Sequence, residues 1–318
     1  MKRHNNPIIW LVLAVFVVLA VLVDQAYIRH VLITACIFST LAQFYNITYG
    51  FVGLYNFGFA AFFGIGAYTS AILATDLGVP VVVAMLLATV VSGIFGFVLM
   101  LPCLRMHGFT PGIVTLAFGE IARILISAAK FTKGEMGYWG IVPLFRSDTA
   151  YAVFAVLMAA LTAVGISLLM KGRVGLAFRT ICDDAQAAES IGNNIKAYKL
   201  LAMTVSCAGA GFVGAFYGHY LMTITPSICG LSYTTQILCM ALFGGIGTIA
   251  GPAIGGIALT ALTEMLRFLD DYRMLIYGLL LIVVIMFFPK GIMGVYDAAK
   301  KGIAAARKGG CGHGDAGD

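Results

Sequence analysis

The sequence contains a run of residues without a single charge, VVVAMLLATVVSGIFGFVLML at positions 81–101. An α-helix needs about 20 apolar residues to cross the hydrocarbon core of a bilayer. Several further runs of this kind occur, whereas a transmembrane β-barrel would show alternating segments of about ten residues. Only 11% of the 318 residues are charged, against about 25% in soluble domains. The sequence therefore predicts an all-α, polytopic membrane protein that folds as a helical bundle.

We expect about ten transmembrane helices. They are predicted at 8–23, 30–47, 59–75, 80–101, 112–129, 150–170, 198–222, 233–249, 251–267 and 274–289. The region 233–267 stays open, because one long broken helix fits it as well as two spans. The N-terminus resembles a signal peptide, but no small-x-small cleavage site follows its apolar stretch, which we interpret as a retained first span. The predicted organisation is an N-terminal segment 1–7, a membrane domain 8–296 that contains the loop 171–199, and a disordered tail 297–318.

The positions of the basic residues predict the orientation. Lys and Arg cluster at residues 2–3, in the loop 171–199 and at 290–308. Six predicted spans separate the first cluster from the second and four separate the second from the third, so all three fall on one side. By the positive-inside rule that side is the cytoplasm, with both termini inside. The loop 130–148, which also carries basic residues, is the exception.

A polar insert, GLAFRTICDDAQAAESIGNN at 175–194, interrupts the apolar sequence. On a helix it forms an apolar stripe, made of Ala177, Ile181, Ala185, Ala188 and Ile191. The opposite face is polar and holds Arg179, Asp183, Gln186 and Ser190. Asp183 with Gln186 is a candidate capping pair and Gly192 a stop signal, which predicts a short helix over about 184–191 at the membrane surface. A stripe made mostly of alanine suits docking into a protein groove; the alternative is a solvated connector that binds nothing.

The insert and its continuation, GRVGLAFRTICDDAQAAESIGNNIKAYKLLAM, resemble the cytoplasmic loop of LivM-like permease subunits of the branched-chain amino-acid ABC transporter family. The resemblance continues through GFAAFFGIGAYTSAIL, GIVTLAFGEIARI, ALFGGIGTIAGPAIGG and IYGLLLIVVIMFFPKGIMG, over roughly residues 30–296. It implies that the loop helix is a coupling helix that sits in a groove of an ATPase subunit. The residues implied in coupling are Arg179, Asp183, Asp184, Ala187, Ala188, Glu189 and Gly192.

The same resemblance implies the partners and the cargo. The partners would be a paralogous permease subunit, two ABC ATPase subunits and a periplasmic or extracellular solute-binding protein, in the bacterial inner membrane. The cargo would be branched-chain or related amino acids, with urea or short amides as the alternative. The chain departs from the family pattern around Asn56, in HGFTPG at 107–112 and at Cys182, where relatives have arginine. The first two departures weaken the expectation about the substrate more than the expectation about the transport mechanism.

Charges and glycines inside the spans are candidates for the translocation pathway. Glu120 with Arg123, and Glu264 with Arg267, stand three residues apart on one helix face, so mutual neutralisation is the alternative to a functional role. The pathway candidates are Asn56, Thr115, Glu120, Gly244, Gly245 and Gly247. The strings AFFGIGA and ALFGGIGT are a candidate internal repeat, against the simpler explanation of close helix packing.

The sequence lacks the motifs of catalysis. No GxxxxGK[ST] occurs, so ATP hydrolysis would need a separate chain. No HExxH, GxSxG or metal-ligand spacing is present, and the seven scattered cysteines fit buried apolar positions better than disulfides. We expect a transport subunit without a cofactor, not an enzyme. The rival hypotheses are an ion-coupled secondary transporter that acts alone, with Glu120 as its acid, and a membrane-embedded enzyme.

Overall fold

The computed structural model describes residues 25–106, 108–265 and 278–279. Most of this part of the chain is helical. The helices are α2 (Ala26–Val52), α3 (Phe59–Thr75), α4 (Val81–Cys103), α5 (Thr110–Ala128), α6 (Asp148–Lys171), α7 (Arg173–Asp183), α8 (Ala185–Ser190), α9 (Ile195–Leu221), α10 (Leu231–Gly244) and α11 (Gly251–Met265). The connections contain the 3-10 turns η1 (Lys130–Thr132), η2 (Gly134–Met136) and η3 (Pro226–Cys229), and the strands β1 (Tyr138–Trp139) and β2 (Thr223–Ile224), which pair antiparallel.

Five helices of the described part are long and apolar enough to cross a membrane, namely α2, α4, α5, α6 and α9. This confirms the prediction of a helical protein with several membrane spans. The predicted span 59–75 has the same bounds as α3, and the other predicted spans between residues 30 and 222 each fall on one helix. The spans at 8–23 and, except for residues 278–279, at 274–289 lie outside the described residues, so the total of ten stays a prediction.

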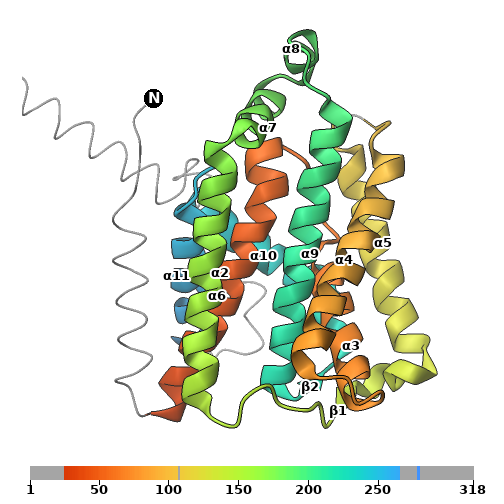
Figure 1. Ribbon diagram of the computed structural model, residues 1–318, viewed down its shortest axis with the longest axis vertical. Coiled ribbons are helices and arrows are strands. Elements are labelled where there is room, and N and C mark those ends of the chain that lie inside the picture. Colours follow the sequence, from red (N-terminus) through yellow and green to blue (C-terminus); the bar gives the residue numbers. More distant parts are fainter. Residues whose placement is uncertain (1–24, 107, 266–277, 280–318) are drawn as a thin grey trace, which may run out of the picture.

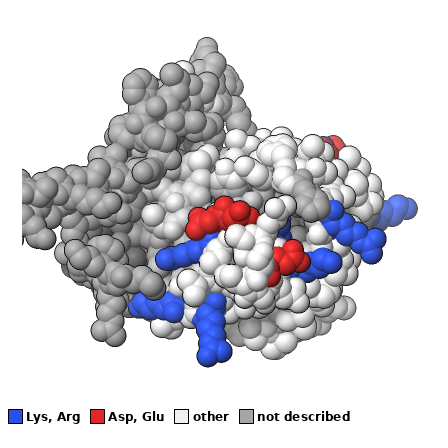
Figure 2. All heavy atoms as spheres, turned by 90° about the horizontal axis from the view of Figure 1, so that it is seen from above, with Lys and Arg blue, Asp and Glu red and all other residues white. Residues whose placement is uncertain are grey.

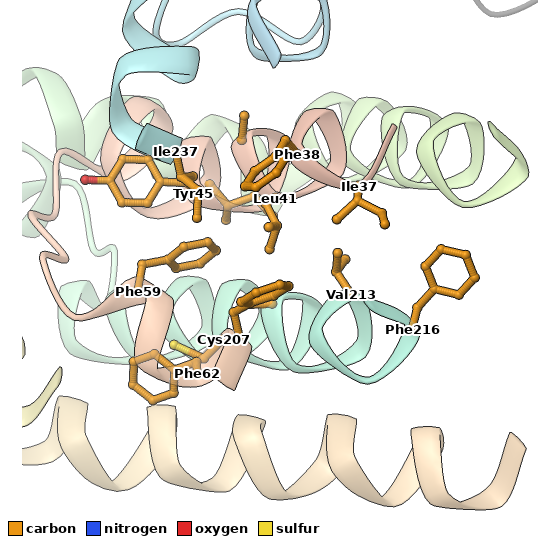
Figure 3. Packing of buried hydrophobic residues seen from close by; sticks show 14 of the residues in the cluster. Ile37, Phe38, Leu41, Tyr45, Phe59, Phe62, Cys207, Val213, Phe216 and Ile237 are labelled. Carbon is orange, nitrogen blue, oxygen red and sulfur yellow. The ribbon is translucent and has the colours of Figure 1, made fainter. Parts of the chain in front are cut away.

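The centre of the bundle is built from α2, α3 and α9, with α4 packed along α3 and α9. A side chain at Gly66 of α3 would collide with the backbone of Gly211 of α9, since its Cβ would lie 2.2 Å from the Gly211 carbonyl oxygen. Small residues let two helix backbones approach this closely. Between the helices, large side chains fill the core, as Phe38 of α2, Phe62 of α3 and Phe216 of α9 do in Figure 3.

The bundle has two distinct ends (Figure 1). The α7–α8 end consists of these two short helices between α6 and α9, and the β1–β2 end consists of the strand pair and residues 130–147. Helices α2, α4 and α6 run toward the α7–α8 end, and α3, α5 and α9 run back. The C-terminus of α2 reaches α7, because a Cβ at Gly53 would lie 3.4 Å from the Cys182 Sγ.

The region 233–267 contains two helices separated by a glycine turn, not one broken helix. Gly245 and Gly247 in the turn have positive φ angles of 115° and 73°, which glycine adopts at no steric cost. Helix α11 then packs along α2. Helix α10 has 14 residues, about 21 Å of helix, and is too short to cross a core of about 30 Å by itself. The predicted span at 233–249 is therefore corrected to a shorter helix, preceded by η3, which packs against α3 and α5.

The two strings of the candidate repeat have different backbone conformations. Residues 61–67 lie in the regular interior of α3, whereas residues 241–248 run from the last turn of α10 into the glycine turn. The prediction of a structural repeat is therefore wrong for these two strings, because one forms part of a helix and the other runs into a turn. The simpler explanation fits α3, where Gly64 and Gly66 lie against neighbouring segments.

Candidate functional site

The polar insert forms two helices rather than one. Asp184 has an extended backbone, with φ −155° and ψ 113°, and separates α7 from α8. Its Oδ1 accepts hydrogen bonds from the backbone N–H groups of Gln186 (2.8 Å) and Ala187 (3.1 Å). Asp184 is therefore the N-cap of α8, and the predicted cap at Asp183 is wrong by one residue, because Asp183 is the last residue of α7.

The far end of α8 is fixed as well. Gly192 has a φ of 87°, and its N–H bonds to the Glu189 carbonyl at 2.9 Å. Asn193 N–H bonds to the Ala188 carbonyl at 3.1 Å. The Asn194 side chain then caps α9 through the Ala197 N–H. Gly192 is thus the stop that the sequence predicted: the Asp184 side chain holds the first turn of the six-residue helix, and backbone bonds hold its last turn.

The apolar stripe of the insert faces mostly inward. Ala177 and Ile181 of α7 are buried, and Ala188 of α8 is only 1% exposed. Leu176 and Ile191, in contrast, are 61% and 71% exposed. Arg179, Asp183, Asp184, Ala187, Glu189 and Gly192 are exposed as well. A partner that contacts this end would therefore meet these side chains, while Ala188 lies beneath them.

More of the described basic residues lie at the α7–α8 end than at the β1–β2 end. Among the described residues, this end carries six, Arg105, Lys171, Arg173, Arg179, Lys196 and Lys199, and the β1–β2 end carries four, Arg29, Lys130, Lys133 and Arg146. Figure 2 views the molecule from the α7–α8 end and shows acidic groups interspersed with the basic ones. The bias agrees in sign with the predicted cytoplasmic location of this end.

Asn56 and Thr115 lie inside the bundle. Thr115 is buried. Its hydroxyl accepts a hydrogen bond from the Phe57 N–H at 3.0 Å and donates one to the Gly112 carbonyl at 2.8 Å. It thereby satisfies a backbone group at the break between α2 and α3, where helical partners are missing. Asn56 is fully buried, its Nδ2 lies 3.5 Å from the Met203 Sδ, and its Oδ1 has no partner among the described residues.

The glycine turn after α10 is fixed to α2 by an asparagine that the sequence did not single out. Asn46 accepts the Gly247 N–H at 2.9 Å through Oδ1, and its Nδ2 donates to the Thr248 carbonyl at 2.8 Å. Gly244 packs against the backbone of Gly251, because a Cβ would lie 1.8 Å from the Gly251 oxygen. An amide inside the apolar stretch 30–47 was the available signal for this contact.

Glu120 and Arg123 form the predicted ion pair on α5. Arg123 Nε donates to Glu120 Oε1 at 2.9 Å, and Nη2 donates to the same oxygen. The side chains of Arg123 and Glu120 are 36% and 45% exposed on the outer face of the bundle. Of the second predicted pair, Arg267 lies outside the described residues.

The predicted positions do not converge on one site. The coupling candidates share the α7–α8 end, Asn56 and Thr115 lie in the interior, and Glu120 lies on the outside of α5. The glycines 244–247 contact α2. Within the described part of the chain, no three His, Cys, Asp or Glu side chains are grouped closely enough to hold a metal ion.

Comparison with known proteins shows that the sequence is similar to those of transport permeases. Residues 27–285 match the family model described as branched-chain amino acid transport system / permease component. The chain is similar to the high-affinity branched-chain amino acid transport system permease protein LivM of Salmonella typhimurium, with 29% identity over 278 residues, or 78% of this chain and 65% of the relative. The chain thus spans slightly less than two thirds of the length of that relative.

Two shorter relatives match this chain over almost their full length. BraD of Pseudomonas aeruginosa is 25% identical over 291 residues, and LivH of Escherichia coli is 24% identical over 292 residues; each match covers 83% of this chain and 93% of the relative. Both carry the name of high-affinity branched-chain amino acid transport system permease protein. No solved structure matches the chain.

Proposed function

This chain belongs to the family of permease components of branched-chain amino acid transport systems, and from that premise we propose that it is the membrane-spanning subunit of a bacterial ABC importer. The observation that carries the proposal is the family match over residues 27–285, which includes the entire α7–α8 end. The relatives named LivM and LivH both match, which supports a pore formed with a second, similar permease.

The α7–α8 end is the proposed joint to the ATPase subunits. Two short helices, held by a side-chain cap at Asp184 and by backbone bonds at Gly192, can transmit a displacement to α6 and α9, which flank them in the chain. The exposed Leu176 and Ile191 supply apolar contacts and Arg179 and Glu189 supply charges. A ligand shifts a conformational equilibrium only through differential contacts with the two states, so nucleotide-dependent contacts here would switch the pore.

The remaining assignments follow from the same premise. The α7–α8 end and both termini would lie in the cytoplasm, and the chain would span the inner membrane. ATP would be hydrolysed on two partner chains, and a solute-binding protein would deliver branched-chain or related amino acids from outside. The names of the relatives support this cargo.

The test is a mild-detergent purification of the chain from its native membrane, with identification of what accompanies it. We expect a P-loop ATPase and a second permease. In the variant Ala187→Arg the recovered ATPase should fall about tenfold, since a charge at the centre of a packed contact costs at least about 1.4 kcal/mol. Met136→Arg, at an exposed position of the β1–β2 end, is the matched control and should retain the ATPase.

Ala188 is not suitable for this test. Its side chain is buried, so an arginine there would disrupt α8 itself and would not report on docking. Recovery of the wild-type chain alone, active in vesicles without ATP, would contradict the proposal and favour a secondary transporter.

A further inference from the structure

The exposed surface of α5 has two unlike sides. Phe109, Ile113, Leu116, Glu120 and Arg123 follow one another at intervals of four and three residues, which places them on one side of the helix. The side facing away from it begins with the exposed Thr110 and continues with apolar residues only, Val114, Ala117, Ile121 and Leu125. Neither side is covered by the described part of this chain. The two sides therefore suit different surroundings.

The side of α5 that carries the ion pair cannot face the hydrocarbon of the membrane. Both side chains are more than a third exposed, and both lie within a span whose neighbouring exposed residues are apolar, such as Ile113 and Ile124. Charged groups inside a membrane span face a protein interior or a water-filled cavity, because lipid does not solvate them. The side with Glu120 and Arg123 must then face water or protein, while the side with Ile121 and Leu125 suits lipid.

The segment after α9 contacts Arg123 and carries polar groups of its own. The stem of Arg123 lies against Gly230, since a Cβ there would be 3.7 Å from Arg123 Cδ. Just before Gly230, the exposed hydroxyls of Thr225 and Ser227 lie 2.7 Å apart. Glu135, exposed in η2, is close enough to Arg123 to interact electrostatically. Glu120 and Arg123 lie in the half of α5 that leads to the β1–β2 end.

We propose that Glu120 and Arg123 form a binding site for the α-ammonium and α-carboxylate groups of the transported amino acid, on the side of the passage opposite the α7–α8 end. The inference rests on the proposed function. Arg123 offers a planar fork of donors that matches a carboxylate, and Glu120 accepts from an ammonium group. The site has no net charge, as an amino-acid zwitterion has none, so the ligand replaces one ion pair by two without adding a charge to the membrane. Leu116 and Ile113, farther along the same side, offer apolar contact to an aliphatic side chain.

The first test uses two cysteines at nearly the same depth. Ile124 and Leu125 are 53% and 62% exposed, but their side chains point about 100° apart around the helix. Each is replaced by cysteine in the purified complex, in a background with Cys182→Ser and Cys311→Ser, and treated with a cationic, membrane-impermeant thiol reagent. We expect Ile124→Cys to react and leucine to slow the reaction, whereas Leu125→Cys stays unmodified. Equal reactivity of the two, or no effect of leucine at Ile124→Cys, would overturn the proposal.

The second test separates binding from simple pairing. The double variant Glu120→Arg with Arg123→Glu keeps an ion pair at the same spacing and reverses its direction. We expect the complex to assemble normally and leucine uptake into ATP-loaded vesicles to fall at least about tenfold, because each misplaced charge loses a charged hydrogen bond. Uptake at the wild-type rate would reduce the pair to a structural role. If the wild-type complex itself shows no ATP-driven uptake of leucine, the proposed function fails; wild-type uptake with an unaffected double variant contradicts only the site.

Discussion

The two ends of the molecule are built in opposite ways. At the β1–β2 end, connecting residues are tied to the bundle by buried side chains: His219 Nδ1 donates to the Val142 carbonyl at 2.6 Å, and the Tyr151 hydroxyl accepts the Leu144 N–H at 2.7 Å. Tyr138 is fully buried and bonds to the Asp76 carboxylate. At the α7–α8 end, short helices are held by backbone bonds and one aspartate cap, and most of their polar side chains are exposed.

The two ends also differ in what they leave exposed. The β1–β2 end satisfies its polar groups from within the chain, so it is fixed without a partner. The α7–α8 end leaves Leu176, Ile191 and a set of charges uncovered. Large apolar side chains are exposed at the β1–β2 end too, at Phe131, Met136 and Trp139, so the contrast between the ends lies in how their connecting segments are held.

The largest effect is expected from His219→Ala at the β1–β2 end. His219 Nδ1 must donate to the carbonyl of Val142, so Nε2 accepts from the Ser70 hydroxyl at 2.8 Å. Alanine leaves both of these groups without their partner in a buried site, which lowers the free energy of unfolding by about 2–4 kcal/mol. Unfolding in mixed detergent micelles, followed by circular dichroism, measures the change. A midpoint equal to that of the wild type would refute the idea that this end is fixed by buried bonds.

A smaller and local effect is expected from Asp184→Ala at the α7–α8 end. Loss of the cap destabilises α8 by about 1 kcal/mol, so amide hydrogen exchange at 185–190 should accelerate about fivefold. Global unfolding should not change. Asp183→Ala is the matched control, because Asp183 caps no helix in the structure. Equal acceleration in both variants would contradict the assignment of the cap to Asp184.

The smallest effect concerns pH at the β1–β2 end. Burial, together with the bond to Asp76, raises the pKa of Tyr138 from its ordinary value of 10.0 to about 12. The unfolded chain therefore releases this proton first, and the stability contributed by the neutral phenol is complete below pH 10 and is lost as pH rises toward 12. Unfolding midpoints at pH 8, 10 and 11 should fall more steeply for the wild type than for Tyr138→Phe. Parallel profiles would contradict the shift.

The sequence predicted the elements that depend on local composition. Apolar runs predicted α3 with its exact bounds, and the spacing of Glu120 and Arg123 predicted their ion pair, because both need only neighbours along one helix. The glycine at 192 predicted the end of α8 for the same reason.

What the sequence missed depends on contacts between distant segments. The bonds of Asn46 to the glycine turn join residues about 200 positions apart, and no local pattern specifies them. The inward orientation of Ala188 has the same origin, because helical spacing defines a stripe without saying what covers it. The cap moved from Asp183 to Asp184 since either aspartate satisfies the pattern and only the backbone break between α7 and α8 selects one.

The central claim is that the α7–α8 end binds an ATPase, and a site-specific cross-link tests it most directly. Ile191→Cys, at a position that is 71% exposed, would carry a short photoactivatable reagent in native membranes, with Met136→Cys at the β1–β2 end as the control. The account predicts that a P-loop ATPase is captured from position 191 and not from position 136. Capture of the ATPase from both positions, or from position 136 alone, would contradict it.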